Sequence, residues 1–296
     1  MATRKKLIDQ QICAGERALY KQSDLKVVNT VFENGESPLK ECRNIDLTGC
    51  LFQWKYPLWY CENIALDRCT LFENARAGVW YSSRVTFKNT DIKAPKNFRR
   101  CKDVTLENVN IYNADETLWS CDGVTLKNVT VGSGSYFAMN SKNIEVDGLT
   151  LNGNYCFDGA ENVVIRNSRL LTKDAFWNSK NVTVYDSLIC GEYLGWNSEN
   201  LTLVNCTVET LQGLCFIDRL KMVNCRLINT TLAFEYSDVD AEITGKVGSV
   251  FNPKSGTIKA DRIDELIIEK DKIDPDKTKI ICNNIGKQSD RPEWLQ

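Results

Sequence analysis

Pairs of hydrophobic residues separated by one polar residue recur at a regular interval along this chain. Clear examples are Val104-Thr-Leu106, Val124-Thr-Leu126 and Val182-Thr-Val184. Alternation with a period of two predicts a short β-strand with one buried face. With the first hydrophobic residue of each pair as position zero, twelve repeats follow one another at nearly constant spacing. These positions are Leu25, Ile45, Ile64, Val85, Val104, Val124, Ile144, Val163, Val182, Leu201, Leu220 and Val239.

Each repeat continues with a predicted bend and two further hydrophobic runs. Asn, Asp or Gly recurs at position plus four, and Asn tolerates the left-handed backbone conformation of a tight bend. Examples are Asn89, Asn108, Asn128, Asn167, Asn205 and Asn224. A second short strand follows, as at Val129 and Val131, and then a third hydrophobic run, as at Thr117-Leu-Trp119. Three short strands per repeat are therefore predicted.

This repeat predicts an all-β protein, a single-stranded right-handed parallel β-helix of about twelve coils, each of roughly 19–21 residues, with end caps. One coil cannot bury its hydrophobic edge alone, so coils stack on one another. We expect one domain over residues 1–296: an N-terminal cap at 1–24, regular coils at 25–245, and degenerate coils with a C-terminal cap at 246–296. Leucine-rich repeats share the period but need a denser leucine skeleton and a helical segment.

Composition excludes several partners. The net charge of −2 predicts no general binding of nucleic acid. There is no run of 18 apolar residues for a membrane and no apolar stretch after the basic N-terminal residues, so we expect a cytoplasmic protein. The 13 cysteines fall mostly at repeat positions that Ser, Ala, Thr or Val occupy elsewhere, which predicts free thiols in the core. Without histidine or paired cysteines, no metal site is expected, and no cofactor fingerprint occurs.

The variable segment just before each first strand is where we expect function. Tryptophan recurs there at position minus five. The indoles could be exposed platforms for sugar rings, or they could fill the core. Strand parity with the apolar residues at minus seven favours the core. The column comprises Trp59, Trp80, Trp119, Trp177, Trp196 and Phe234.

Side chains of the opposite parity are then predicted to point outward along one groove. Carboxylates, tyrosines, a lysine and exposed rings in a groove suit a polyhydroxylated ligand. A solvated face with ordinary salt bridges is the alternative. The candidate ligand-binding residues are Glu116, Tyr136, Tyr155, Phe157, Lys173, Phe176 and Tyr193, together with Asp174 and Glu192.

Asp174 and Glu192 are the candidate catalytic residues because they lie on neighbouring coils. When two carboxyl groups lie this close together, the pKa of one of them rises, as in the acid/base pair of a glycosidase. Lys173 could instead neutralise both and leave a structural ion pair. The absence of histidine excludes catalysis by imidazole and the histidine motif of polygalacturonases. No acidic cluster like the calcium site of pectate lyases is evident.

The chain resembles an uncharacterised bacterial family of right-handed β-helix proteins, known as a domain of unknown function. The resemblance implies the fold and no activity. It rests on segments spread over most of the chain: Gly35–Lys40, Trp54–Tyr60, Ala75–Gly78, Ala94–Lys96, Lys173–Asn178 and Gly191–Trp196.

Three functions remain open at this point. The first is binding of a carbohydrate or similar polar small molecule along the groove. The second is a carbohydrate-active enzyme, a glycosidase, lyase or epimerase, that uses Asp174 and Glu192. The third is a scaffold that forms a homodimer or docks another protein through the same face.

Overall fold

A computed structural model describes residues 5–292 of the chain. The chain comprises two compact units, Met1–Gly153 and Asn154–Gln296, which are described separately below. Residues 1–4 and 293–296, the outer ends of the two predicted caps, lie outside the described residues. The single-domain organisation stays a prediction.

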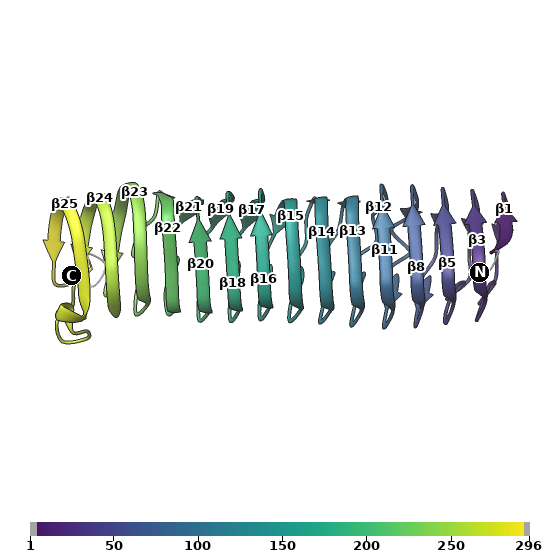
Figure 1. The fold of residues 1–296 in the computed structure, drawn as a ribbon, viewed down its shortest axis with the longest axis horizontal. Helices are drawn as coiled ribbons and strands as arrows, with labels where there is room; N and C mark the ends of the chain where they lie inside the picture. The colour runs from purple at the N-terminus through teal and green to yellow at the C-terminus, as the bar shows by residue number, and fades with distance from the viewer. Residues whose placement is uncertain (1–4, 293–296) are drawn as a thin grey trace. The chain divides into compact units, whose positions relative to one another are not determined.

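Unit 1 is a stack of parallel β-coils, and its strands form successive rungs in Figure 1. Val104 pairs with Val124 and Val124 with Ile144, so equivalent residues of successive repeats form a column as predicted. The strands are β1 (Lys6–Asp9), β2 (Ile12–Cys13), β3 (Ser23–Val28), β4 (Val31–Phe32), β5 (Arg43–Thr48), β6 (Leu51–Phe52), β7 (Leu58–Trp59), β8 (Glu62–Asp67), β9 (Thr70–Leu71), β10 (Val79–Trp80), β11 (Ser83–Lys88), β12 (Asp91–Ile92), β13 (Lys102–Ile111), β14 (Asp122–Val131) and β15 (Lys142–Gly153).

Unit 2 has the same parallel pattern within itself, with Val163 paired to Val182 and Val182 to Leu201. A short 3-10 helix, η1 (Pro275–Lys277), precedes its last strand. The strands are β16 (Glu161–Arg166), β17 (Arg169–Thr172), β18 (Lys180–Tyr185), β19 (Leu188–Gly191), β20 (Glu199–Val204), β21 (Thr207–Thr210), β22 (Asp218–Ile228), β23 (Asp238–Phe251), β24 (Ser255–Ile267) and β25 (Thr278–Ser289).

The chain is an all-β parallel β-helix, but it has more coils than the twelve predicted. β1 pairs in parallel with β3 from Lys6 opposite Leu25, so an additional coil precedes the first recognised repeat. β24 and β25 add two coils after Val239, within the segment predicted to hold degenerate coils. The residues that align with position zero in these three coils are Lys6, Gly256 and Thr278. Because none of them is a large hydrophobic residue, the hydrophobic pattern did not count these coils.

The predicted bends are confirmed. The six asparagines named above all have a positive φ, between 48° and 54°, and Asn29, four residues after Leu25, has a φ of 47°. Their amides also bond to one another on the surface: Asn128 Nδ2 donates to Asn108 Oδ1 over 3.2 Å, and Asn108 Nδ2 donates to Asn89 Oδ1 over 3.2 Å. Asparagine therefore supplies both the left-handed bend and a bond between coils.

The predicted third strand is largely absent from the described residues. On the side of the coil where the third strand was predicted, β7 and β10 pair with each other through two residues each. In most other repeats the segment is a turn, held to its neighbours by single backbone hydrogen bonds such as Ala138 N to Thr117 O at 2.9 Å.

The interior of each unit is filled with aliphatic side chains, phenylalanines and cysteines. Ten of the 13 cysteines are buried, and Cys13, Cys190 and Cys282 are half-buried. Buried thiols lie near backbone carbonyls of the neighbouring coil, as Cys121 Sγ does at 2.9 Å from Phe98 O. Their free-thiol state stays a prediction.

Candidate functional site

The variable segment before each first strand has an alternating backbone. In the repeat that leads to Val124, Glu116, Leu118 and Ser120 have positive φ values of 50°, 57° and 55°, while Thr117 and Trp119 do not. A left-handed residue changes the direction of the side chains around it, so the parity rule of extended strands fails here. Leu118 is buried, and Trp119 next to it is half-buried at the surface.

The prediction that the tryptophan column fills the core is therefore wrong. Trp59, Trp80, Trp119, Trp177 and Trp196 are all half-buried on the outside of the coils. Phe234, assigned to the same column, is buried. The residues predicted to be exposed, Phe157 and Phe176, have 0% exposure and stack on each other with ring centroids 5.6 Å apart. They support the core and cannot contact a ligand at the surface.

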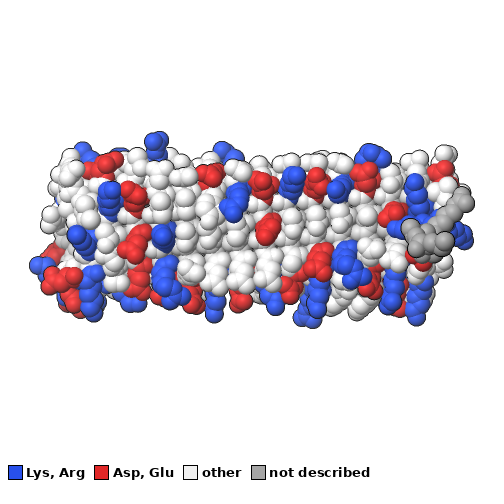
Figure 2. Space-filling view, viewed as in Figure 1, with Lys and Arg blue, Asp and Glu red and all other residues white. Residues whose placement is uncertain are grey.

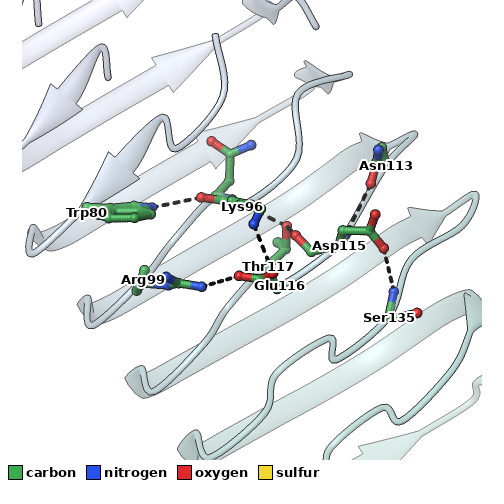
Figure 3. Close-up of polar contacts among 9 residues, drawn as sticks. Trp80, Lys96, Arg99, Asn113, Asp115, Glu116, Thr117 and Ser135 are labelled. Carbon is green, nitrogen blue, oxygen red and sulfur yellow. Dashed lines mark hydrogen bonds and ion pairs between the residues drawn. The ribbon is translucent and has the colours of Figure 1, made fainter. Parts of the chain in front are cut away.

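In unit 1 the ring faces are covered by their neighbours. Trp59 and Trp80 stack with centroids 5.1 Å apart and planes 5° apart. The Arg99 guanidinium lies 4.8 Å from the Trp80 ring and 5.1 Å from the Trp119 ring, a cation between two π faces. The Trp80 indole N–H donates to Lys96 O over 2.8 Å (Figure 3). Stacked in this way, the indoles stabilise the contact between coils, and the stacked faces are not available to a sugar ring.

Unit 2 has an equivalent ladder. Trp177 and Trp196 stack at 5.7 Å, and Tyr155 packs edge-on against Trp177 at 5.8 Å. The Trp177 indole donates to Tyr193 O over 2.6 Å, and the Tyr193 ring lies 5.2 Å from Trp196. Phe216, exposed and 5.3 Å from Trp196, extends the ladder.

Glu116 is held in an ion triad in unit 1. Its carboxylate accepts a hydrogen bond from Lys96 Nζ at 2.9 Å and another from Arg99 (Figure 3). The bond from Lys96 lowers the pKa of Glu116, against the opposing effect of partial burial, and Arg99 lowers it further. With its charge matched twice, Glu116 acts as a structural anion. Tyr136, the next candidate in this unit, is half-buried with its ring 5.9 Å from Trp119.

Asp174 occupies the same repeat position as Glu116 and has the opposite environment. It is 1% exposed, and within residues 5–292 neither of its carboxylate oxygens has a hydrogen-bond partner. Burial raises the pKa of Asp174; the nearby Lys173 charge lowers it, and the Glu192 charge raises it. Unlike Glu116, Asp174 does not have a positive φ, so the local backbone directs its carboxyl group differently.

Lys173 and Glu192 flank this carboxyl group at the surface. Lys173 Nζ lies 3.6 Å from a Glu192 oxygen, and their side chains are 49% and 45% exposed. The same ammonium lies 5.9 Å from the Tyr193 ring. Below, Cys156 Sγ contacts Thr172 Oγ1 at 2.7 Å, and burial raises the pKa of Cys156 to about 12. Unit 2 thus brings together Lys173, Asp174, Glu192 and Tyr193, with Tyr155 one ring away on Trp177.

Sequence reasoning missed Arg99 and Lys96, which complete the unit 1 cluster. The signal was available for Arg99, because it occupies the tryptophan column between Trp80 and Trp119 and a cation between aromatic rows can stack on both. For Lys96 the signal was the repeat itself, because Lys96 and Glu116 both stand eight residues before a first strand in successive repeats.

Two further features bear on the class of site. Among residues 5–292, no group of three or more Cys, Asp or Glu side chains is placed to hold a metal ion. No helix within the described range is long and apolar enough to cross a bilayer.

Stacked parallel coils with a lateral aromatic ladder define a parallel β-helix repeat protein with a candidate polar site on its surface. The chain belongs to the family described as "Protein of unknown function (DUF3737)", whose model matches residues 6–281. No curated protein matches the chain.

Solved structures with some likeness to this chain are distant from it in sequence. PfbA, a surface adhesin of Streptococcus pneumoniae, has 9% identity over 96% of this chain and 82% of its own, with a TM-score of 0.36. The A-module of the Azotobacter vinelandii mannuronan C-5 epimerase AlgE4 has 10% identity over 96% and 87%, with a TM-score of 0.28. QnrB1, a plasmid-mediated fluoroquinolone resistance protein, has 12% identity over 74% and 91%, with a TM-score of 0.22. These likenesses carry no argument about function.

Proposed function

We propose that the protein binds a polyhydroxylated ligand, such as a saccharide, at the unit 2 cluster of Lys173, Asp174, Glu192 and Tyr193. The observation that carries the proposal is the Asp174 carboxyl group, which is buried and without a partner among the described residues. An unsatisfied buried polar group costs about 1–3 kcal/mol. Folded proteins retain such a cost chiefly at functional positions.

The chemistry around Asp174 suits hydroxyl groups. A ligand hydroxyl can donate to the Asp174 carboxyl group, while the Lys173 ammonium and the Tyr193 phenol offer donors to other hydroxyl oxygens. Lys173 and Glu192 are joined by only one exposed ion pair of 3.6 Å. Exposed pairs are weak, typically below about 1 kcal/mol, so a ligand can separate this one to reach Asp174.

The proposal excludes stacking on the tryptophans from the binding mode. Two tryptophans stack on each other in each unit, and Arg99 lies on the rings of Trp80 and Trp119. Recognition through polar groups therefore predicts discrimination between saccharides by hydroxyl configuration.

The test is a glycan array with a parallel thermal-shift screen on the full chain. At least one saccharide should raise the melting temperature, and Asp174→Asn and Glu192→Gln should each weaken its binding at least tenfold. Glu199→Gln is the matched control, because Glu199 is an equally exposed unit 2 carboxylate engaged with Arg219 at 2.7 Å. If no saccharide stabilises the protein, or if Asp174→Asn binds as well as the parent, the proposal is wrong.

A second candidate function is acid/base catalysis on the same ligand class. The burial of Asp174 favours it, because burial raises the pKa of this carboxyl group and so favours the protonated form that a general acid needs. On the neighbouring coil, the residue directly beside Glu192 is Lys173, whose backbone carbonyl accepts a hydrogen bond from Glu192 N over 2.7 Å. Turnover of a saccharide by the parent protein that disappears in Asp174→Asn, at saccharide concentrations that saturate the variant, would identify an enzyme, whereas binding without turnover in the parent protein identifies a binding protein.

A further inference from the structure

A cavity lies in unit 1, away from the Glu116 triad. It has a volume of about 600 Å³ and is lined by Lys21, Ser23, Glu41, Arg43 and Tyr60. Ser23 and Arg43 begin strands β3 and β5, and the other three residues belong to the turns before β3, β5 and β8. The cavity is therefore a groove between two columns of side chains that the repeat sets side by side.

One of these columns contains an interrupted aromatic stack. Lys21, Glu41, Tyr60 and Tyr81 are equivalent residues of four successive coils, with positive φ values of 56°, 60°, 57° and 57°. Tyr60 and Tyr81 stack with centroids 5.0 Å apart and planes 8° apart. At the next position the column has Glu41, so the ring stack ends at Tyr60, which is 49% exposed.

Glu41 does not fill the position of a third ring. Its carboxylate is drawn toward the preceding coil, where it accepts a hydrogen bond from Tyr20 Oη at 3.2 Å and lies 3.4 Å from Lys21 Nζ. The coil spacing of about 4.8 Å is also close to the distance at which flat rings stack. A planar ring in the groove can therefore continue the stack on the outer face of Tyr60, when the flexible Lys40 side chain, whose ammonium lies over that ring at 5.6 Å, moves aside.

The groove also has an excess of positive charge. Lys40 Nζ lies 5.6 Å from the Tyr60 ring and has no acidic partner among residues 5–292. Arg43 lies 3.6 Å from Glu62, a carboxylate that also binds Arg84 more closely. Among the residues that line the groove, Lys21 and Arg43 are cationic and Glu41 is the one carboxylate. Arg43 is 69% exposed, and its guanidinium fork is suited to a carboxylate or phosphate.

We infer that this groove binds a planar aromatic anion, whose ring stacks on Tyr60 and whose anionic group pairs with Arg43 and Lys40. The site is independent of the proposed saccharide site, and neither proposal depends on the other. Two ligand sources share the chemistry, an aromatic carboxylate and a nucleoside monophosphate. They differ in the anionic group, which a titration can distinguish.

The test is calorimetric titration of the full chain with benzoate and with AMP. Each has a matched control that lacks one feature: cyclohexanecarboxylate has the charge without a planar ring, and adenosine has the ring without the charge. Binding of benzoate, AMP or both is expected, with at least tenfold weaker binding of the corresponding control. The inference is overturned if either control binds as tightly as its anion, or if neither anion binds at millimolar concentration.

Variants locate the site. Tyr60→Leu and Arg43→Gln should each weaken binding of the anion at least tenfold, and Tyr60→Phe should retain it because the ring remains. Both positions are substantially exposed, so loss of folding is not expected, and an unchanged melting temperature verifies this. Asp174→Asn should leave this binding unchanged. Unaltered affinity in Tyr60→Leu or Arg43→Gln would place the ligand elsewhere and contradict the inference.

Discussion

At the scale of single residues, Glu116 and Asp174 show how one repeat position can serve two purposes. The carboxylate of Glu116 meets Lys96 and Arg99, whereas that of Asp174 is buried without a partner among the described residues. The pKa of Glu116 is lowered and that of Asp174 is raised. The two carboxyl groups should therefore affect the free energy of unfolding with opposite signs.

Asp174→Asn should stabilise the protein at neutral pH, by on the order of 1 kcal/mol, because the amide carries no charge that burial penalises. Below its unfolded pKa near 4, Asp174 is protonated in both states and contributes no difference. As pH rises, the unfolded state loses the proton first, so the parent loses stability through the window between the unfolded pKa and the raised folded pKa. The charged groups that act on Asp174 are Lys173 and Glu192. Urea unfolding from pH 3 to pH 8 measures this, and an advantage of Asn that does not grow with pH would contradict it.

Glu116→Gln should show the reverse dependence. Because the folded pKa of Glu116 is lowered, its stabilising contribution is present above the unfolded pKa and is lost as pH falls through the folded value. The variant should therefore be less stable than the parent at pH 7 and similar to it at low pH. The same urea series measures it, with a stabilised variant at pH 7 as the contradicting result.

At the scale of elements, the turn that replaces the third strand decides which side chains reach the surface. Phe157 and Phe176 have positive φ values of 58° and 62° and point into the core, and Trp177 follows outside. Left-handed non-glycine residues cost about 1–2 kcal/mol each, so the stacked coils must hold them in place. At the bends after the first strands, asparagine lowers this cost because it tolerates the left-handed conformation.

Asn128→Val should destabilise the protein by about 1–2 kcal/mol. Asn128 has a φ of 52°, which a β-branched residue adopts with difficulty, and its amide bonds to Asn108. Asn128→Gly is the matched control, because glycine accepts the backbone conformation and loses only the side-chain bond. Chemical denaturation measures both, and equal losses in the two variants would show that the bond, and not the backbone, matters.

At the scale of the whole molecule, the repeat sets the positions of the charged side chains at the surface and of the cysteines in the core. Acidic and basic side chains are interspersed on the face shown in Figure 2. Many pair between coils, as Lys88 and Glu107 do at 2.8 Å. Each exposed pair contributes little, so core packing carries the stability. Cysteine acts there as a small hydrophobic residue.

Thiol titration of the native protein should show at most three readily reactive cysteines, Cys13, Cys190 and Cys282. The other ten are buried, and burial raises the pKa of thiols such as Cys61, to about 12, which suppresses the reactive thiolate. In denaturant without reductant all 13 should react. A smaller number in denaturant would mean that disulfides are present and that the free-thiol prediction is wrong.

The sequence by itself determined the fold, because the strand alternation and the asparagine bends are local properties that every coil repeats. Val104, Val124 and Ile144 had to form a column once the period was known. It also located the variable segment and Asp174, Glu192 and Lys173 within it. Only the tertiary structure decided which side chains of that segment face outward, because left-handed residues break the parity of a strand. Whether Glu116 or Asp174 finds a cation depends on the neighbouring coil, which lies one full repeat away in the chain and only one strand spacing away in space.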